Sequence, residues 1–177
     1  GFSAHTTKAA VEALNGFPFD TVMFPINHVE YYNRGYGKEV LELAREKGAA
    51  VLAIKPMSAG AWAQGAARGR RWWYRSLEAQ EEIDLAFRFA LSRPGVVMGF
   101  APAWLDLVEK AIEAGRAFRP LDDADEARLR EMARGCGSIF QREEDAVARG
   151  EEPRSPYPHA PHEPECGEGG SLRGGWA

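Results

Sequence analysis

Lys55 is the residue whose position points most directly to chemistry, because it closes the apolar run AAVLAIKP at 49–56. Such a run predicts a buried β-strand, and parallel sheets collect ligands and reactive groups at the carboxyl ends of their strands. An ammonium group there can pair with a carboxylate at the rim or bind a phosphate. If desolvation lowers its pKa, it can instead attack a carbonyl carbon as a Schiff-base nucleophile. The sequence leaves all three roles open.

Further polar side chains follow two other apolar runs of the chain. Ser3 and His5 follow the first run, and Asn27, His28 and Glu30 follow the second. Neutral hydrogen-bonding groups that converge on one edge of a sheet suit recognition of an amide or a sugar. For each group taken alone, the sequence favours a helix cap or a satisfied loop contact over ligand recognition.

Two other segments could bind an anion. Gly99 closes the apolar run at 95–100 just before a predicted helix, so backbone N–H groups there could hold a phosphate. The segment RGRRWWYR at 68–75 combines four Arg with two Trp and a Tyr and could clamp an anionic ligand. A solvated helix with inward aromatic side chains would have the same composition.

Metal and thiol chemistry has weaker support. His159, His162 and Cys166 have the spacing H-x2-H-x3-C, which could bind zinc but lacks a fourth ligand. Cys136 has no His near it in the sequence, which favours an inert packed thiol over a nucleophile. Two distant cysteines do not make a disulfide framework.

The elements that position these residues are short strand-like runs, each followed by a helical pattern. The strands are predicted at 1–3, 20–27, 49–56 and 95–100, and helices at 6–16, 37–48, 77–92, from about 102, and at 123–135. We expect HVEYYNRGYG at 28–37 to be a loop, the third strand to be covered on both faces, and Leu105, Val108 and Ile112 to face inward. Strands that alternate with helices predict an α/β protein with a parallel sheet.

Composition excludes several classes of protein. The 177 residues include 22 Lys and Arg against 26 Asp and Glu, without a basic stripe, so we expect no nucleic-acid partner. No apolar run approaches the roughly 20 residues that span a bilayer, and no signal peptide opens the chain. We therefore expect a soluble, cytoplasmic protein without a membrane partner. A domain is predicted over 1–150, and the Pro-, His-, Glu- and Gly-rich segment 151–177 is predicted to be disordered.

Four segments, in order, resemble the fifth to eighth strand regions of the aldo/keto reductases. They are GFSAHT at 1–6, FPINHVEYY at 24–32, VLAIKPMSAG at 51–60 and GVVMGFAPAWLDLVEKAI at 95–112. The resemblance is greatest to the bacterial branch with GFS-x-H and Lys-Pro strand ends. It implies a (β/α)8 barrel of the TIM type, of which this chain would hold about four C-terminal βα units, and a further N-terminal part.

The resemblance also implies NAD or NADP as cofactor and a small-molecule carbonyl compound as substrate. The family's catalytic Asp, Tyr, Lys and His lie on the first four strand ends, which have no counterpart here, so no catalytic residue is assigned. The residues expected at the cofactor are Ser3, Asn27, His28, Lys55, Pro56, Met57 and Gly99.

Three functional hypotheses follow. The first is the cofactor-side half of an NAD(P)H-dependent aldo/keto reductase. The second is a non-catalytic half-barrel that binds a partner or associates with itself through its open sheet edges. The third is a lyase that uses Lys55 to form a Schiff base.

Overall fold

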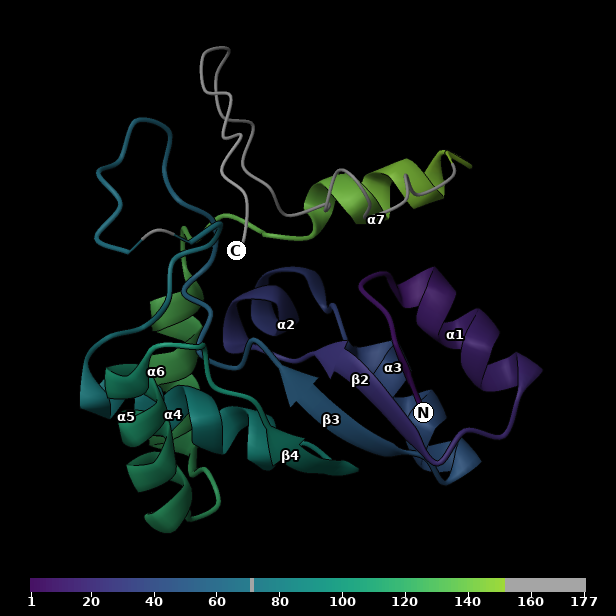
Figure 1. Ribbon diagram of the computed structural model, residues 1–177, viewed down its shortest axis with the longest axis horizontal. Helices are drawn as coiled ribbons and strands as arrows, with labels where there is room; N and C mark the ends of the chain where they lie inside the picture. The colour runs from purple at the N-terminus through teal and green to yellow at the C-terminus, as the bar shows by residue number, and fades with distance from the viewer. Residues whose placement is uncertain (71, 152–177) are drawn as a thin grey trace, which may run out of the picture.

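The computed structural model describes residues 1–70 and 72–151, and its centre is a parallel four-stranded sheet (Figure 1). The strands are β1 (Phe2–Ser3), β2 (Thr21–Pro25), β3 (Ala50–Ile54) and β4 (Val96–Gly99), which pair in sequence order. The predicted α/β architecture is therefore confirmed. The predicted zinc pattern of His159, His162 and Cys166, and the disordered tail beyond residue 151, lie outside the described residues.

Helices follow each strand and provide the crossover connections. They are α1 (Thr7–Gly16), α2 (His28–Arg34), α3 (Lys38–Lys47), α4 (Gln80–Leu91) and α5 (Leu105–Arg116), with α6 (Asp123–Ala133) and α7 (Gln141–Ala148) beyond the last strand. Local signals explain the boundaries. Thr6 caps α1 by accepting a hydrogen bond from the Ala9 N–H, and Gly48 ends α3 at a φ of 75°.

The predicted loop at 28–37 is wrong, because most of it is α2. The Asn27 side chain accepts a hydrogen bond from the Glu30 N–H at 3.0 Å, which satisfies a free donor of the first turn. Gly35, with a φ of 69°, ends the helix. The N-cap and C-cap residues define a short helix in a segment whose aromatic and polar composition suggested a loop.

The predicted inward face of α5 is also wrong. Leu105 is 80% exposed and Ile112 is 48% exposed, whereas Leu107, Ala111 and Ala114 are buried. The buried positions include two alanines, whose small side chains suit close packing of α5 against α4. The prediction placed the largest apolar side chains inward and therefore missed the face of α5 that is buried through its alanines.

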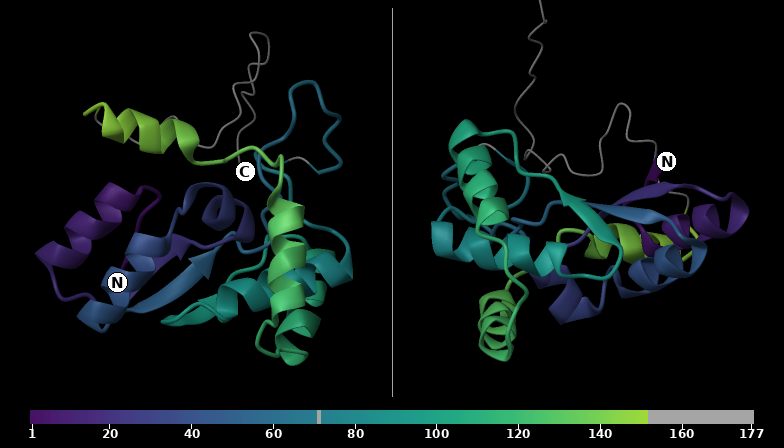
Figure 2. Two further views of the ribbon diagram at one scale, coloured as in Figure 1. Left: turned by 180° about the vertical axis from the view of Figure 1, so that it is seen from behind. Right: turned by 90° about the horizontal axis from the view of Figure 1, so that it is seen from below.

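The two faces of the sheet differ in burial. Val22, Phe24, Val51 and Ala53 are 0% exposed and belong to one apolar cluster with the buried side chains of α3. Figure 2 shows α3 against one face of the sheet. The alternate residues of β2 and β3 are mostly half-buried, and Val97 on β4 is 63% exposed. The prediction that β3 is covered on both faces is therefore wrong for the part of the chain described here. One face of the sheet lacks a covering layer among these residues.

The C-terminal part begins with α6, which carries a capping box between Asp122 and Asp125. An ion pair between Arg88 and Asp125 joins α6 to α4. Residues 135–148, which we call the C-terminal strap, follow α6 and include α7, which lies near α1 and α2 (Figure 1). Phe140 precedes α7 and is 2% exposed, so the strap contributes to the main core.

Candidate functional site

Lys55 occupies an unusual backbone conformation at the end of β3. Its φ of 58° lies in the left-handed region, and no other non-glycine residue among 1–70 and 72–151 has a positive φ. A side chain in this region costs of the order of 1 to 3 kcal/mol, and such strain is often found at functional positions. The Lys55 Nζ lies 3.0 Å from the Nε2 of His5, which follows β1.

Aromatic rings surround this lysine–histidine pair. The Lys55 Nζ lies 5.7 Å from the ring centre of Trp73 and 5.6 Å from that of Phe140. Tyr36 stacks on Phe140 at a centroid distance of 5.1 Å and donates a hydrogen bond to the His5 backbone oxygen at 2.7 Å. The three rings come from the long loop after β3, the strap and the segment after α2, so tertiary packing builds the enclosure.

Enclosure changes the charge balance of Lys55. Desolvation by burial lowers the pKa of its ammonium group from 10.5 to about 8. Within the described residues Lys55 forms no ion pair, so the salt bridge considered from the sequence is not made there. A substantial minority of Lys55 side chains is consequently neutral near pH 7.5. The remaining side chains carry a positive charge that could pair with an anionic ligand.

The other predicted rim residues lie at the same edge of the sheet. Ser3 ends β1 and is exposed, Gly99 ends β4, and Asn27, two residues after β2 ends, is the N-cap of α2. Because all four strands are parallel, Ser3, Asn27, Lys55 and Gly99 share the carboxyl edge. The Asn27 Oδ1 caps α2, whereas its buried Nδ2 has no hydrogen-bond partner among the described residues. Phe100, after Gly99, donates its N–H to Ala53.

The remaining predicted cofactor residues point into the interior. Pro56 and Met57 are buried, and Met57 belongs to the apolar cluster between α4 and α5. His28 is 1% exposed and meets Phe89 edge-on at 6.5 Å. Burial lowers the pKa of His28 to about 4, so its imidazole is neutral at physiological pH. The cofactor contacts assigned to these residues stay predictions.

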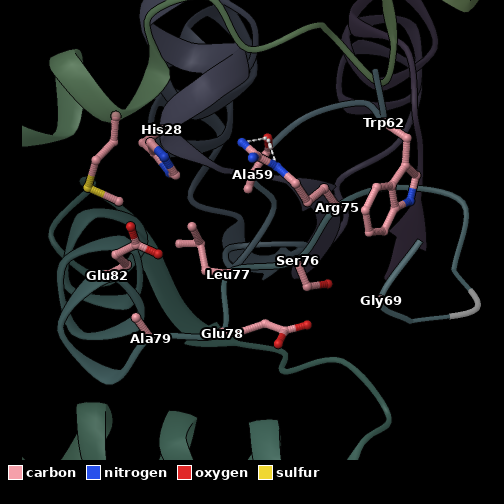
Figure 3. Close-up of a pocket in the computed structure, with 11 residues that line it drawn as sticks. His28, Ala59, Trp62, Gly69, Arg75, Ser76, Leu77, Glu78, Ala79 and Glu82 are labelled. Carbon is pink, nitrogen blue, oxygen red and sulfur yellow. Dashed lines mark hydrogen bonds between the residues drawn. The ribbon is translucent and has the colours of Figure 1, made fainter. Parts of the chain in front are cut away.

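His28 also lines a pocket of about 400 Å³, which is separate from the pair of Lys55 and His5. The side chains of His28, Glu82 and Leu77 point toward the same space, with Arg75 and Trp62 on the opposite side (Figure 3). Arg75 donates to the Ala59 backbone oxygen at 3.1 Å and contacts the Cys136 Sγ at 3.6 Å. Its guanidinium therefore also holds the surrounding backbone together.

The arginine- and tryptophan-rich segment serves mainly to hold the loop after β3 in place. Arg70 pairs with Glu78 at 2.9 Å and also with Asp106. Trp72 packs edge-on against Trp104 at 5.2 Å, and Tyr74 is 3% exposed. An anion that bound to Arg70 would have to displace these two carboxylates. Arg71 lies outside the described residues.

The strap supplies contacts that the sequence did not reveal. The Glu30 carboxylate accepts hydrogen bonds from the Ser138 hydroxyl at 2.7 Å and the Ile139 N–H at 2.6 Å. Desolvation raises the pKa of Glu30, although both hydrogen bonds oppose the shift. At the other end of the strap, Glu144 accepts a hydrogen bond from the Thr7 N–H at 2.7 Å, at the N-terminus of α1. The strap is thus fixed to the segments that follow β1 and β2.

One sequence signal could have revealed the strap. The Ser138 Oγ accepts hydrogen bonds from the N–H groups of Phe140 and Gln141, as a serine does at the start of a helix. A serine followed three residues later by Gln141, at the start of a polar helix, is a recognisable N-terminal signal. The role of Phe140 in the enclosure has no such signal, because it depends on residues more than 60 positions away.

No group of three or more metal-binding side chains occurs within residues 1–70 and 72–151. The helices of the same residues include none that is long and apolar enough to cross a membrane.

Comparison with known proteins supports the fold. No protein-family model matches the chain, and no curated protein matches it. Among solved structures, the chain resembles the holo form of the aldo-keto reductase AKR11C1 from Bacillus halodurans, with a TM-score of 0.53 and 19% sequence identity. The match covers 80% of this chain and 52% of that protein. The chain therefore shares its fold with about half of an aldo-keto reductase.

Proposed function

We propose that this chain forms the cofactor-side half of an NAD(P)H-dependent carbonyl reductase of the aldo/keto reductase type. The observation that carries the proposal is the shared carboxyl edge, where Ser3, Asn27 and Lys55 follow successive parallel strands. The similar fold of an aldo-keto reductase, matched over about half of its length, supports the same reading.

The groups at this edge fit a dinucleotide. Lys55 has a cation that no carboxylate neutralises among the described residues, and a phosphate would pair with it. Asn27 has a buried Nδ2 donor without a partner there, and an amide oxygen of a ligand would accept from it. When bound, the nicotinamide would supply hydride to a carbonyl carbon, and these side chains would orient it.

The barrel would be completed by further βα units. The uncovered face of the sheet and the edge strands β1 and β4 suit closure against four more strands. Those units would also bring the acid that protonates the developing alkoxide, because no catalytic acid is assigned on this chain. General acid catalysis is worth about a hundredfold or more, so the 177-residue chain alone should not reduce carbonyls.

The test is binding of NADPH and of NADH, measured by calorimetry and by energy transfer from tryptophan to the nicotinamide. We expect binding that Lys55→Met weakens about tenfold, whereas Lys47→Met, which removes an exposed lysine on α3, leaves it unchanged. Nicotinamide absorbance with small aldehydes should stay constant. Equal binding by both variants, or turnover by the chain alone, would contradict the proposal.

A further inference from the structure

The geometry points to Lys55 as a reactive amine that condenses with small aldehydes, with His5 as its proton-transfer partner. Three structural features carry this inference: the contact between the two nitrogens, the aromatic enclosure and the strained backbone of Lys55. The reaction does not require a bound dinucleotide. It is therefore independent of the reductase proposed above.

The contact between Lys55 and His5 defines the proton-transfer route. At 3.0 Å, the Nζ and Nε2 share a hydrogen bond in which one nitrogen donates to the lone pair of the other. When Nζ donates, the imidazole Nε2 is unprotonated and can take the proton. His5 is held for this role, because Tyr36 bonds its backbone oxygen and its ring packs on Phe140 at 5.8 Å.

The enclosure makes the amine available without a neutralising carboxylate. Trp73 and Phe140 flank the Nζ, and these rings replace water around the ammonium. A carboxylate would stabilise the charged form, but the described residues provide none at this nitrogen. Burial lowers the pKa to about 8, which raises the neutral fraction near neutral pH by about 300-fold relative to a pKa of 10.5. Lys55 is half-buried, so part of the residue stays exposed to solvent.

The reaction balances without an added oxidant or reductant. The Nζ lone pair forms a bond to the aldehyde carbon, the C=O π bond breaks, and the oxygen becomes a hydroxyl group. The first proton that the nitrogen loses passes to the His5 Nε2 and from there to the aldehyde oxygen, which gives this hydroxyl group. The nitrogen then loses its second proton to the His5 Nε2, and the imidazolium passes it to the carbinolamine hydroxyl, which leaves as water while the C=N bond forms. The products are one imine at Lys55 and one water molecule.

The test is reductive trapping on the full 177-residue chain. The protein is incubated with propanal and cyanoborohydride, and each lysine is quantified by peptide mass mapping. We expect Lys55 to be modified about tenfold or more faster than Lys8 and Lys47, which are exposed lysines in the same sample. Its rate should level off above about pH 8, while the rates of the exposed lysines should continue to rise.

Substitution of His5 separates chemistry from accessibility. His5→Phe keeps an aromatic ring beside Lys55 but removes the proton acceptor, so Lys55 modification should fall severalfold while modification of Lys8 stays constant. Circular dichroism checks that the variant is folded. Equal rates at Lys55, Lys8 and Lys47 in the folded protein would overturn the inference.

Added NADPH distinguishes the two proposals. Protection of Lys55 by NADPH would support both the amine chemistry and dinucleotide binding at this edge. Preferential modification without protection would support the amine chemistry and count against the proposed cofactor site.

Discussion

At the scale of single residues, burial of ionisable side chains determines how this protein responds to pH. His28 is 1% exposed, and its pKa falls from 6.5 to about 4 because burial disfavours the imidazolium ion. Between these values the unfolded chain binds more protons than the folded one. The contribution of His28 to stability is therefore fully present above about pH 6.5 and is lost as the pH falls toward 4.

We predict that His28→Leu makes the protein less sensitive to acid. His28 should contribute up to roughly 3 kcal/mol of the loss in unfolding free energy between pH 6.5 and about 4. Urea unfolding of both proteins across this range gives the comparison. Carboxylates titrate in the same range, so the difference between the two slopes is the relevant quantity. Equal slopes would show that His28 is accessible to protons in the folded state.

Single residues were predicted best where the strand pattern alone places them. The apolar runs put Ser3 and Lys55 at strand ends, and the parallel sheet brings those ends to one edge. The contact of Lys55 with His5, and the interior position of His28, depend on side-chain packing between distant segments. No local sequence pattern contains that information. The positive φ of Lys55 could not be predicted either, because lysine rarely adopts this backbone conformation.

At the scale of elements, the C-terminal strap is the part that the sequence described least. The start of the strap packs directly on the loop after β3, because a Cβ atom added at Gly60 would lie 2.6 Å from the backbone oxygen of Gly137. The Ala61 N–H donates to the same oxygen at 2.8 Å. The strap therefore joins the long loop to α1 and α2, and Phe140 fills the space between them.

We predict that Phe140→Ala destabilises the protein by about 3 to 5 kcal/mol, because it removes a ring that is 2% exposed and leaves a cavity beside Tyr36. Phe118→Ala is the matched control, since Phe118 is 44% exposed, and it should cost less than about 1 kcal/mol. Urea denaturation measures both. Similar losses in the two variants would mean that the strap is not part of the folded core.

The element predictions failed where small or polar residues carry the signal. Caps at Asn27 and Gly35 define α2, and two alanines define the buried side of α5. Hydrophobic periodicity detects large apolar side chains, so it located the long helices and all four strands but not these features. The helix α7 has no buried residue, so it lacks an apolar pattern, and only the serine before its first turn could have indicated it.

At the scale of the whole molecule, the sheet has one covered face and one face that no layer of the described residues covers. Val97 on the edge strand β4 is 63% exposed and Met98 is 48% exposed. Unpaired backbone groups on an edge strand favour pairing with another strand. In a preparation that contains only this chain, the available partner is a second copy.

We predict that the 177-residue chain associates with itself as its concentration rises. Val97→Lys should weaken the association, because it places a charge on the exposed edge strand. Leu105→Lys is the control, since Leu105 is 80% exposed but lies on α5 and outside the sheet. Sedimentation velocity distinguishes the species. A monomer at all concentrations, or equal effects of the two substitutions, would exclude the edge as the interface.

The position of Phe140 has a consequence for synthesis of the protein. Its ring packs on His5 and Tyr36, more than 100 residues earlier in the chain. Contacts of such long sequence separation close late in folding. While a ribosome is still adding residues up to 140, the emerging βα units lack this ring, and the apolar space beside Tyr36 stays open. Chaperones that recognise exposed apolar surface would therefore bind the nascent chain until the strap leaves the exit tunnel.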